Sequence, residues 1–100
     1  MAHTVHKLNQ ERSMNASCRI LDSTLREGRQ TPRIYFTHDQ KLRLAEMIDA
    51  AGVDIIEVGV PSAGEAERRG IRAITKLGLA AELVTWNRMT KEDIRHSVSV

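Results

Sequence analysis

The chain has 100 residues, enough for one domain at most, and its hydrophobic fraction of 41% is ordinary for a globular chain. The formal net charge is only +2 and the basic residues are scattered, which argues against a nucleic-acid-binding protein. One cysteine excludes an internal disulfide, and the lack of an apolar run of about 18 residues predicts no membrane span. We therefore expect a cytoplasmic protein in a reducing compartment.

Residues 1–17 are polar and show no hydrophobic periodicity. A segment of this kind buries too little apolar surface to fold, so we expect a disordered tail there and a folded domain over residues 18–100. The tail lacks the apolar core of a secretory signal peptide. A transit peptide is weakly supported, because arginine is sparse in the tail and Glu11 is acidic.

Short apolar runs and amphipathic stretches alternate along the rest of the chain. We predict, in order, a strand at residues 19–22, a loop at 23–36, a helix at 37–51, a strand at 53–60, a helix at 65–77, a strand at 81–86 and a helix from 90 onward. Thr37 and Gln40 are placed to form a capping box, and Gly52 and Gly78 to end the first two long helices. Such alternation predicts an α/β fold with parallel strands and crossover helices.

The spacing of about 30 residues per strand-helix unit suits both a (β/α)8 barrel and a doubly wound open sheet. Periodicity alone leaves both architectures open. A complete barrel takes about 250 residues, so a barrel protein of this type would have about three of its eight units in this chain.

The most informative segment is residues 22–30, Asp-Ser-Thr-Leu-Arg-Glu-Gly-Arg-Gln, which follows the first predicted strand. Ligands bind at the carboxyl ends of parallel strands in both architectures. Arg26 offers a planar fork of donors, Glu27 is a hard oxygen ligand for a divalent metal, and Gln30 both donates and accepts hydrogen bonds. Gly28 permits a turn that a side chain would obstruct. The alternative interpretation is a salt-bridged surface loop.

Glu57 is the second candidate site residue. Strand alternation places Ile55, Glu57 and Gly59 on one face of the second strand, and one face of a barrel strand points into the barrel. A carboxylate buried there is costly unless it is paired. The position therefore favours either a site role or a salt bridge to Arg26, and both interpretations place Glu57 beside the site.

Basic and acidic side chains interleave in the second long helix, where Glu65 and Glu67 alternate with Arg68, Arg69 and Arg72. Opposite charges at helical spacing are typical of a surface that faces water. We therefore interpret this stretch as a solvated helix face.

Residues 22–30 resemble the first-strand signature of the pyruvate carboxyltransferase-like enzymes in the DRE-TIM metallolyase superfamily. This group includes homocitrate synthase, 2-isopropylmalate synthase, citramalate synthase and the 3-hydroxy-3-methylglutaryl-CoA lyases. Residues 56–61, Ile-Glu-Val-Gly-Val-Pro, and residues 84–89, Val-Thr-Trp-Asn-Arg-Met, also resemble the ends of the second and third strands of these enzymes. The resemblance covers about residues 20–94.

The form of the motif with Ser23 and Glu27 is most similar to homocitrate synthase, whereas isopropylmalate synthases more often carry Asp in place of Glu27. Arg29 departs from the family pattern, in which an acidic residue is common at this position. The resemblance implies that residues 18–100 are the N-terminal part of a (β/α)8 TIM-barrel domain, with about three β-α units. It also implies a homo-oligomer, a dimer, for the full-length enzyme.

The implied activity is a metal-dependent Claisen condensation of acetyl-CoA with a 2-oxo acid, 2-oxoglutarate being favoured. Residue by residue, the resemblance makes Glu27 a ligand of Zn, Mn or Mg and Arg26 the catalytic group that polarises the keto oxygen. The resemblance implies that Gln30 joins Arg26 in binding the 2-oxo acid, and from its position in the second strand we expect Glu57 to bind substrate beside them. Arg88, after the third strand, would contact a substrate carboxylate or a CoA phosphate, or else be a solvated loop arginine. The family's His-x-His metal ligands have no counterpart in this sequence.

Three hypotheses follow for function. The first is part of a homocitrate synthase-type acyltransferase, with an isopropylmalate or citramalate synthase as the alternative specificity. The second is a non-catalytic remnant, or a subunit that needs the rest of the barrel in trans. The third is an unrelated α/β interaction module, but the flavodoxin-like form predicts a phosphate-binding glycine loop after the first strand, which is absent.

Overall fold

The computed structural model describes residues 18–100, and the predicted tail at residues 1–17 lies outside them. The elements are β1 (Leu21–Asp22), α2 (Thr24–Gln30), α3 (His38–Ala50), β2 (Ile55–Gly59), the 3-10 helix η1 (Pro61–Ala63), α4 (Glu65–Thr75), β3 (Glu82–Thr85) and α5 (Lys91–Val98). None of the helices in this described part is long and apolar enough to cross a membrane.

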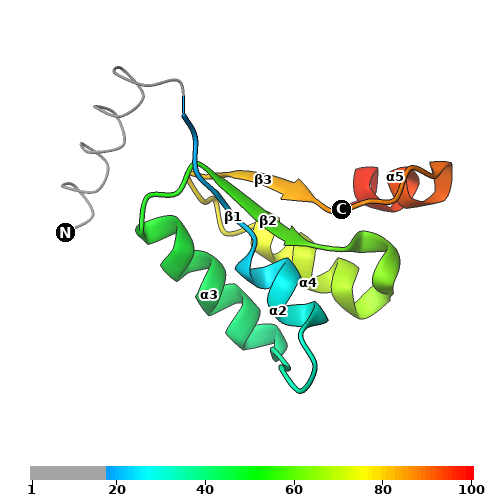
Figure 1. Ribbon diagram of the computed structural model, residues 1–100, viewed down its shortest axis with the longest axis horizontal. Coiled ribbons are helices and arrows are strands. Elements are labelled where there is room, and N and C mark those ends of the chain that lie inside the picture. The colour runs from blue at the N-terminus through cyan, green and yellow to red at the C-terminus, as the bar shows by residue number, and fades with distance from the viewer. Residues whose placement is uncertain (1–17) are drawn as a thin grey trace.

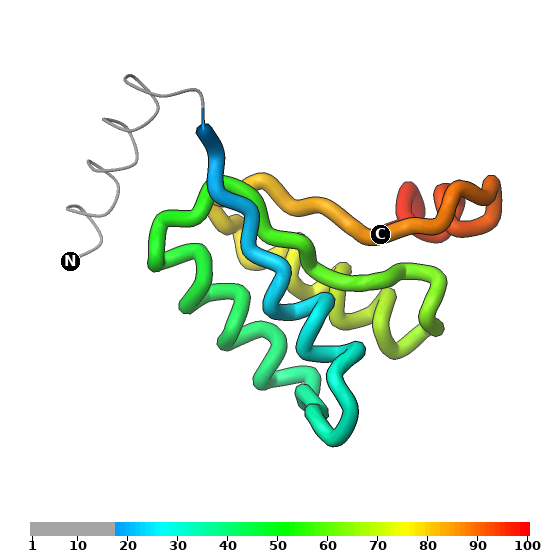
Figure 2. Tube along the Cα trace, viewed as in Figure 1, coloured from blue at the N-terminus to red at the C-terminus, as the bar shows by residue number. Residues whose placement is uncertain are grey.

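The three strands form one parallel sheet in the order β1-β2-β3 (Figure 1). Helical chain after β1 and after β2 returns to the start of the next strand, as the tube in Figure 2 shows, and α5 follows β3. This confirms the predicted α/β class. The arrangement is that of three consecutive β-α units of a (β/α)8 barrel.

The hydrophobic core lies between the sheet and the two longest helices, α3 and α4, which cover the same face of the sheet (Figure 1). Ile56 and Val58 of β2 are buried against Ile71 and Ile74 of α4 and Ala45 of α3. Burying one such side chain stabilises a fold by about 1.5–3 kcal/mol. Because side chains alternate along a strand, this burial turns the neighbouring residues of β2 to the opposite face.

The predicted start of α3 is confirmed by its capping contacts, and α3 and α4 end one and two residues before the predicted ends at residues 51 and 77. The Thr37 side chain accepts a hydrogen bond from the Gln40 backbone at 3.2 Å, and the Gln40 side chain accepts one from the Thr37 backbone at 2.9 Å. Gly52 and Gly78, which follow the two helices, have φ angles of 86° and 69°. Only glycine adopts this left-handed conformation without a steric penalty, so these residues end the helices.

The prediction of a loop at residues 23–36 is wrong for its first half, because residues Thr24–Gln30 form helix α2. The Asp22 carboxylate accepts hydrogen bonds from the Thr24 backbone at 2.9 Å and from the Thr24 hydroxyl at 3.0 Å, which satisfies one of the N–H groups left unpaired at the start of the helix. Leu25 is buried in the core. The helix thus depends on contacts outside its own sequence pattern.

Gly28 lies inside α2, so the prediction that it provides a turn is also wrong. A Cβ atom at this position would lie 2.4 Å from the ring of Phe36, which is far closer than atoms approach in real structures. Glycine is therefore needed because the Phe36 ring packs directly against the backbone of α2.

The prediction of a solvated face on α4 is correct for Glu65 and wrong for Glu67. Glu65 is exposed and pairs with Arg68 at 3.1 Å and Arg72 at 2.9 Å. The side chain of Glu67 is only 6% exposed. Glu67, Ile71 and Ile74 follow the i, i+4, i+7 spacing of one helix face, which turns this carboxylate toward the protein interior.

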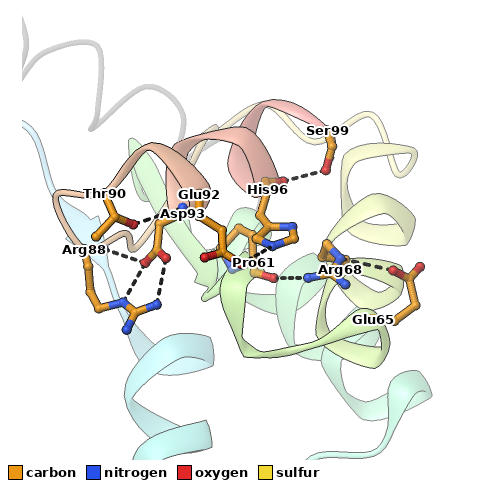
Figure 3. A network of polar contacts seen from close by, with 9 residues as sticks. All are labelled: Pro61, Glu65, Arg68, Arg88, Thr90, Glu92, Asp93, His96 and Ser99. Atoms are coloured by element: carbon orange, nitrogen blue, oxygen red, sulfur yellow. Dashed lines mark hydrogen bonds and ion pairs between the residues drawn. The ribbon is translucent and has the colours of Figure 1, made fainter.

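Helix α5 begins at an ion pair between the partly exposed Arg88 and the buried Asp93 (Figure 3). The Asp93 carboxylate accepts hydrogen bonds from the Arg88 backbone at 2.9 Å and from its guanidinium at 3.0 and 2.9 Å. The Thr90 hydroxyl in turn accepts a bond from the Asp93 backbone at 3.2 Å. The bonds from Arg88 hold the pKa of Asp93 well below its usual range.

This ion pair predicts how the stability of α5 depends on pH. A carboxylate with a lowered pKa in the fold stabilises it above the unfolded-state pKa of about 3.9, and this stabilisation is lost as the pH falls toward the folded-state pKa. We expect Asp93→Asn to speed amide hydrogen exchange of residues 91–98, after correction for intrinsic rates, and the difference from wild type to shrink below about pH 4. Glu92→Gln, at an exposed neighbour, serves as the control and should show little difference at any pH. A difference for Asp93→Asn that stays constant with pH would contradict the assignment.

Candidate functional site

The candidate site lies at the carboxyl ends of the strands, where α2 follows β1 directly. Arg26 of α2 reaches the second strand, and its Nε lies 2.5 Å from Oε1 of Glu57. The same guanidinium donates through Nη1 to the side-chain oxygen of Gln30 at 3.1 Å. The structure therefore brings Arg26, Gln30 and Glu57 together, and it contains the predicted salt bridge.

The Arg26–Glu57 pair is partly shielded from water, since the exposed fractions of the two side chains are 22% and 14%. The hydrogen bond to the carboxylate raises the pKa of Arg26 above its usual value, so this side chain stays cationic. Glu57 and Gln30 occupy only part of the guanidinium fork. Its remaining N–H groups are free to donate to a carbonyl or carboxylate oxygen of a ligand.

Glu27, the predicted metal ligand, points into solvent. Its side chain is 64% exposed and lies 3.8 Å from Nη2 of Arg26. Among residues 18–100, no group of three or more His, Cys, Asp or Glu side chains is placed to hold a metal ion. Glu27 thus fits the chemistry of a single oxygen ligand, while the described residues do not form a complete metal site.

Arg88 lies after β3, at the same end of the sheet, but its partner is Asp93 and not the Arg26–Glu57 pair. Its side chain is 63% exposed, yet two of its nitrogens are held by the buried carboxylate. It is therefore an oriented arginine and not a freely solvated one. The sequence signal for Asp93 is its place three residues after Thr90, which is the spacing of a helix N-cap.

A cavity of about 610 Å³ lies near the N-terminal ends of α3 and α4. Its lining includes His38, Lys41, Glu67 and Arg69, and it also includes Arg29 of α2. Arg26 and Glu57 are not among the lining residues. The candidate site and this cavity are therefore separate, with α2 contributing a side chain to each.

Comparison with known proteins identifies several similar sequences. The chain is 51% identical over 81 residues to a putative (R)-citramalate synthase of Methanothermobacter thermautotrophicus, covering 81% of the chain and 16% of that protein. It is 46% identical over 80 residues to homocitrate synthase 1 of Nostoc sp., covering 80% and 21%. It is 42% identical over 79 residues to 2-isopropylmalate synthase 2 of Caldanaerobacter subterraneus, covering 79% and 21%.

The chain thus spans between 16% and 21% of the length of these relatives. The family model described as HMGL-like matches residues 17–100, which is all of the folded part described above. Since the match covers the motif helix, the three strands and α5, the chain belongs to the HMGL-like family.

Proposed function

We propose that these residues contribute the first part of the active site of an acyltransferase that condenses acetyl-CoA with a 2-oxo acid. The observation that carries the proposal is the Arg26 guanidinium, held by Glu57 at the carboxyl ends of parallel strands with donors left free. That end of the strands is where barrel enzymes bind their substrates. The similarity to three kinds of synthase supports the same reaction class.

The proposed role of Arg26 follows from its geometry. A 2-oxo acid carries a carboxylate and a neighbouring keto oxygen, and a guanidinium fork can donate to both. As the new carbon–carbon bond forms, the keto oxygen gains negative charge, and a fixed cation stabilises that charge more than it stabilises the ground state. Glu57 orients the fork, because it holds Nε in place and leaves the outer nitrogens available.

Gln30 would act beside Arg26 in the same substrate site. Its side-chain oxygen accepts a hydrogen bond from Arg26, and this leaves its amide nitrogen as the donor for a ligand. This donor suits an oxygen of the 2-oxo acid. Arg88, fixed by Asp93, would meet a more distant anionic group such as a second carboxylate or a CoA phosphate.

We further propose Glu27 as one ligand of a divalent metal, either Zn, Mn or Mg. When bound, such an ion would assist the reaction as a Lewis acid toward the keto oxygen. The remaining ligands, a His-x-His pair in the family that this sequence resembles, would come from outside these 100 residues. The same holds for the base that deprotonates acetyl-CoA.

Three 2-oxo acids are candidate substrates, one for each kind of synthase that the chain is similar to. The Ser23 and Glu27 form of the motif favours homocitrate synthesis from 2-oxoglutarate. The highest identity quoted above, 51%, is instead to a putative citramalate synthase. The specificity constants of the full-length gene product for 2-oxoglutarate, pyruvate and 2-oxoisovalerate decide between them, and turnover of none of the three would contradict the proposed reaction.

The first prediction for this site concerns Arg26 in the full-length gene product. Arg26→Lys keeps the positive charge but loses the planar fork, so both Glu57 and the substrate lose directed donors. We expect kcat to fall by about a hundredfold or more, as when other donors to a developing oxyanion are removed. Release of free CoA from acetyl-CoA measures this rate. Arg43→Lys, an exposed arginine of α3, is the matched control and should retain wild-type kcat. Near-normal kcat for Arg26→Lys would contradict the proposed role.

The second prediction concerns a polypeptide limited to these 100 residues. One carboxylate does not bind a catalytic metal tightly, and the chain has no His-x-His segment. We expect no CoA release above background with acetyl-CoA and any of the three 2-oxo acids, under conditions in which the full-length product is active. Turnover by the rigorously purified 100-residue polypeptide would contradict the proposal that the other metal ligands and the catalytic base lie outside these residues.

A further inference from the structure

Glu67 is a buried carboxylate that the proposed reaction does not use. It lies in the first turn of α4, and its side chain is only 6% exposed. An ionised carboxylate removed from water costs free energy unless charges and hydrogen bonds compensate it. The partners of Glu67 therefore indicate what it does in the fold.

Both oxygens of Glu67 have partners, and these come from three other parts of the chain. Oε1 lies 2.8 Å from Nζ of Lys41 in α3. Oε2 lies 2.8 Å from Nε of Arg29 in α2, and it accepts a hydrogen bond at 3.4 Å from the backbone of Val60, just after β2. One carboxylate thus joins α2, α3 and the end of β2 to α4.

The link to α2 matters because this helix has only seven residues. Isolated helices shorter than about 12 residues are marginal in water, so α2 depends on contacts with its surroundings. Arg26 ties it to β2 through Glu57, and Arg29, three residues further on, ties it to α4 through Glu67. The two ion pairs together restrain both the position and the rotation of the helix.

Little else holds α2 to α4. The helix packs mainly on β2 and α3. The cavity of about 610 Å³ is bordered by Arg29, Glu67 and residues at the start of α4, so side-chain packing does not fill this region. The Arg29–Glu67 ion pair lies in the wall of this cavity and directly links the two helices.

We infer that Glu67 is a positioning residue, which fixes α2 through Arg29 and thereby sets the orientation of Arg26 toward its ligand. The link to a 2-oxo acid rests on the proposed function. The restraint on α2 does not, because it follows from the contacts of Glu67 alone.

Amide hydrogen exchange of the full-length gene product tests the restraint. In Glu67→Gln the side chain keeps its shape but loses its charge, so Arg29 is released. We expect the amides of residues 24–30 to exchange about fivefold faster or more, while those of residues 68–75 exchange as in wild type. The matched control is Glu65→Gln, which removes a carboxylate from the same helix turn at an exposed position and should leave residues 24–30 unchanged.

A second pair of variants tests the restraint from the other side, in case Glu67→Gln unfolds α4. Arg29→Gln removes the partly exposed end of the pair and should speed exchange in residues 24–30 in the same way. Arg29→Lys keeps a cation there and should restore most of the protection. The control is Arg69→Gln, an exposed arginine of α4 that lines the same cavity. Wild-type exchange of residues 24–30 in Arg29→Gln, or faster exchange confined to α4 in Glu67→Gln, would overturn the inference.

Kinetics then separate this inference from the proposed function. If Arg26 binds the 2-oxo acid, Glu67→Gln should raise the KM for that substrate and leave the KM for acetyl-CoA near wild type. A rise in both KM values together would overturn the link to Arg26. If the full-length wild type turns over no 2-oxo acid, the proposed function fails, while the exchange experiment still decides the restraint on α2.

Discussion

A short helix at the end of a strand depends on side chains from other elements to stay in place. Helix α2 is too short to be stable by itself, and four tertiary contacts hold it: Leu25 in the core, the Phe36 ring against Gly28, and the ion pairs of Arg26 and Arg29. The first β-α unit is thereby joined to the second at two points. The rest of the candidate site depends on this junction, because Arg26 and Gln30 both belong to α2.

Strand β2 contributes side chains both to the hydrophobic core and to the candidate site. Its alternation sends Ile56 and Val58 toward α3 and α4, where their burial stabilises the sheet. The same alternation turns Glu57 to the other face, where it is paired with Arg26 and costs little to bury. A shift of one residue in the register of β2 would move the carboxylate into the apolar core, so the hydrophobic packing also fixes the position of the site.

Much of this fold could be predicted from the sequence, because the signals for it are local. The capping box at Thr37, the glycine stops and the apolar runs each depend on a few adjacent residues. Helix α2 could not be predicted in that way, since its Asp22 contact is local but also typical of a turn, and the burial of Leu25 becomes visible only when the core is assembled. The spacing of Glu67 to Ile71 and Ile74 indicates that it is buried, but the neighbouring arginines favour the interpretation of a solvated face.

Arg29 departs from the family motif, and its ion pair with the distant Glu67 gives a physical reason for that departure. In the family that this sequence resembles, an acidic residue is common at that position. An acidic side chain there would face the buried Glu67 with like charge, and Lys41 alone would have to compensate both. Arg29 instead supplies the second cation that this carboxylate needs. The departure is therefore compatible with the motif, because Arg29 pairs with Glu67 and not with Glu57, and it serves to hold the helix that presents Arg26.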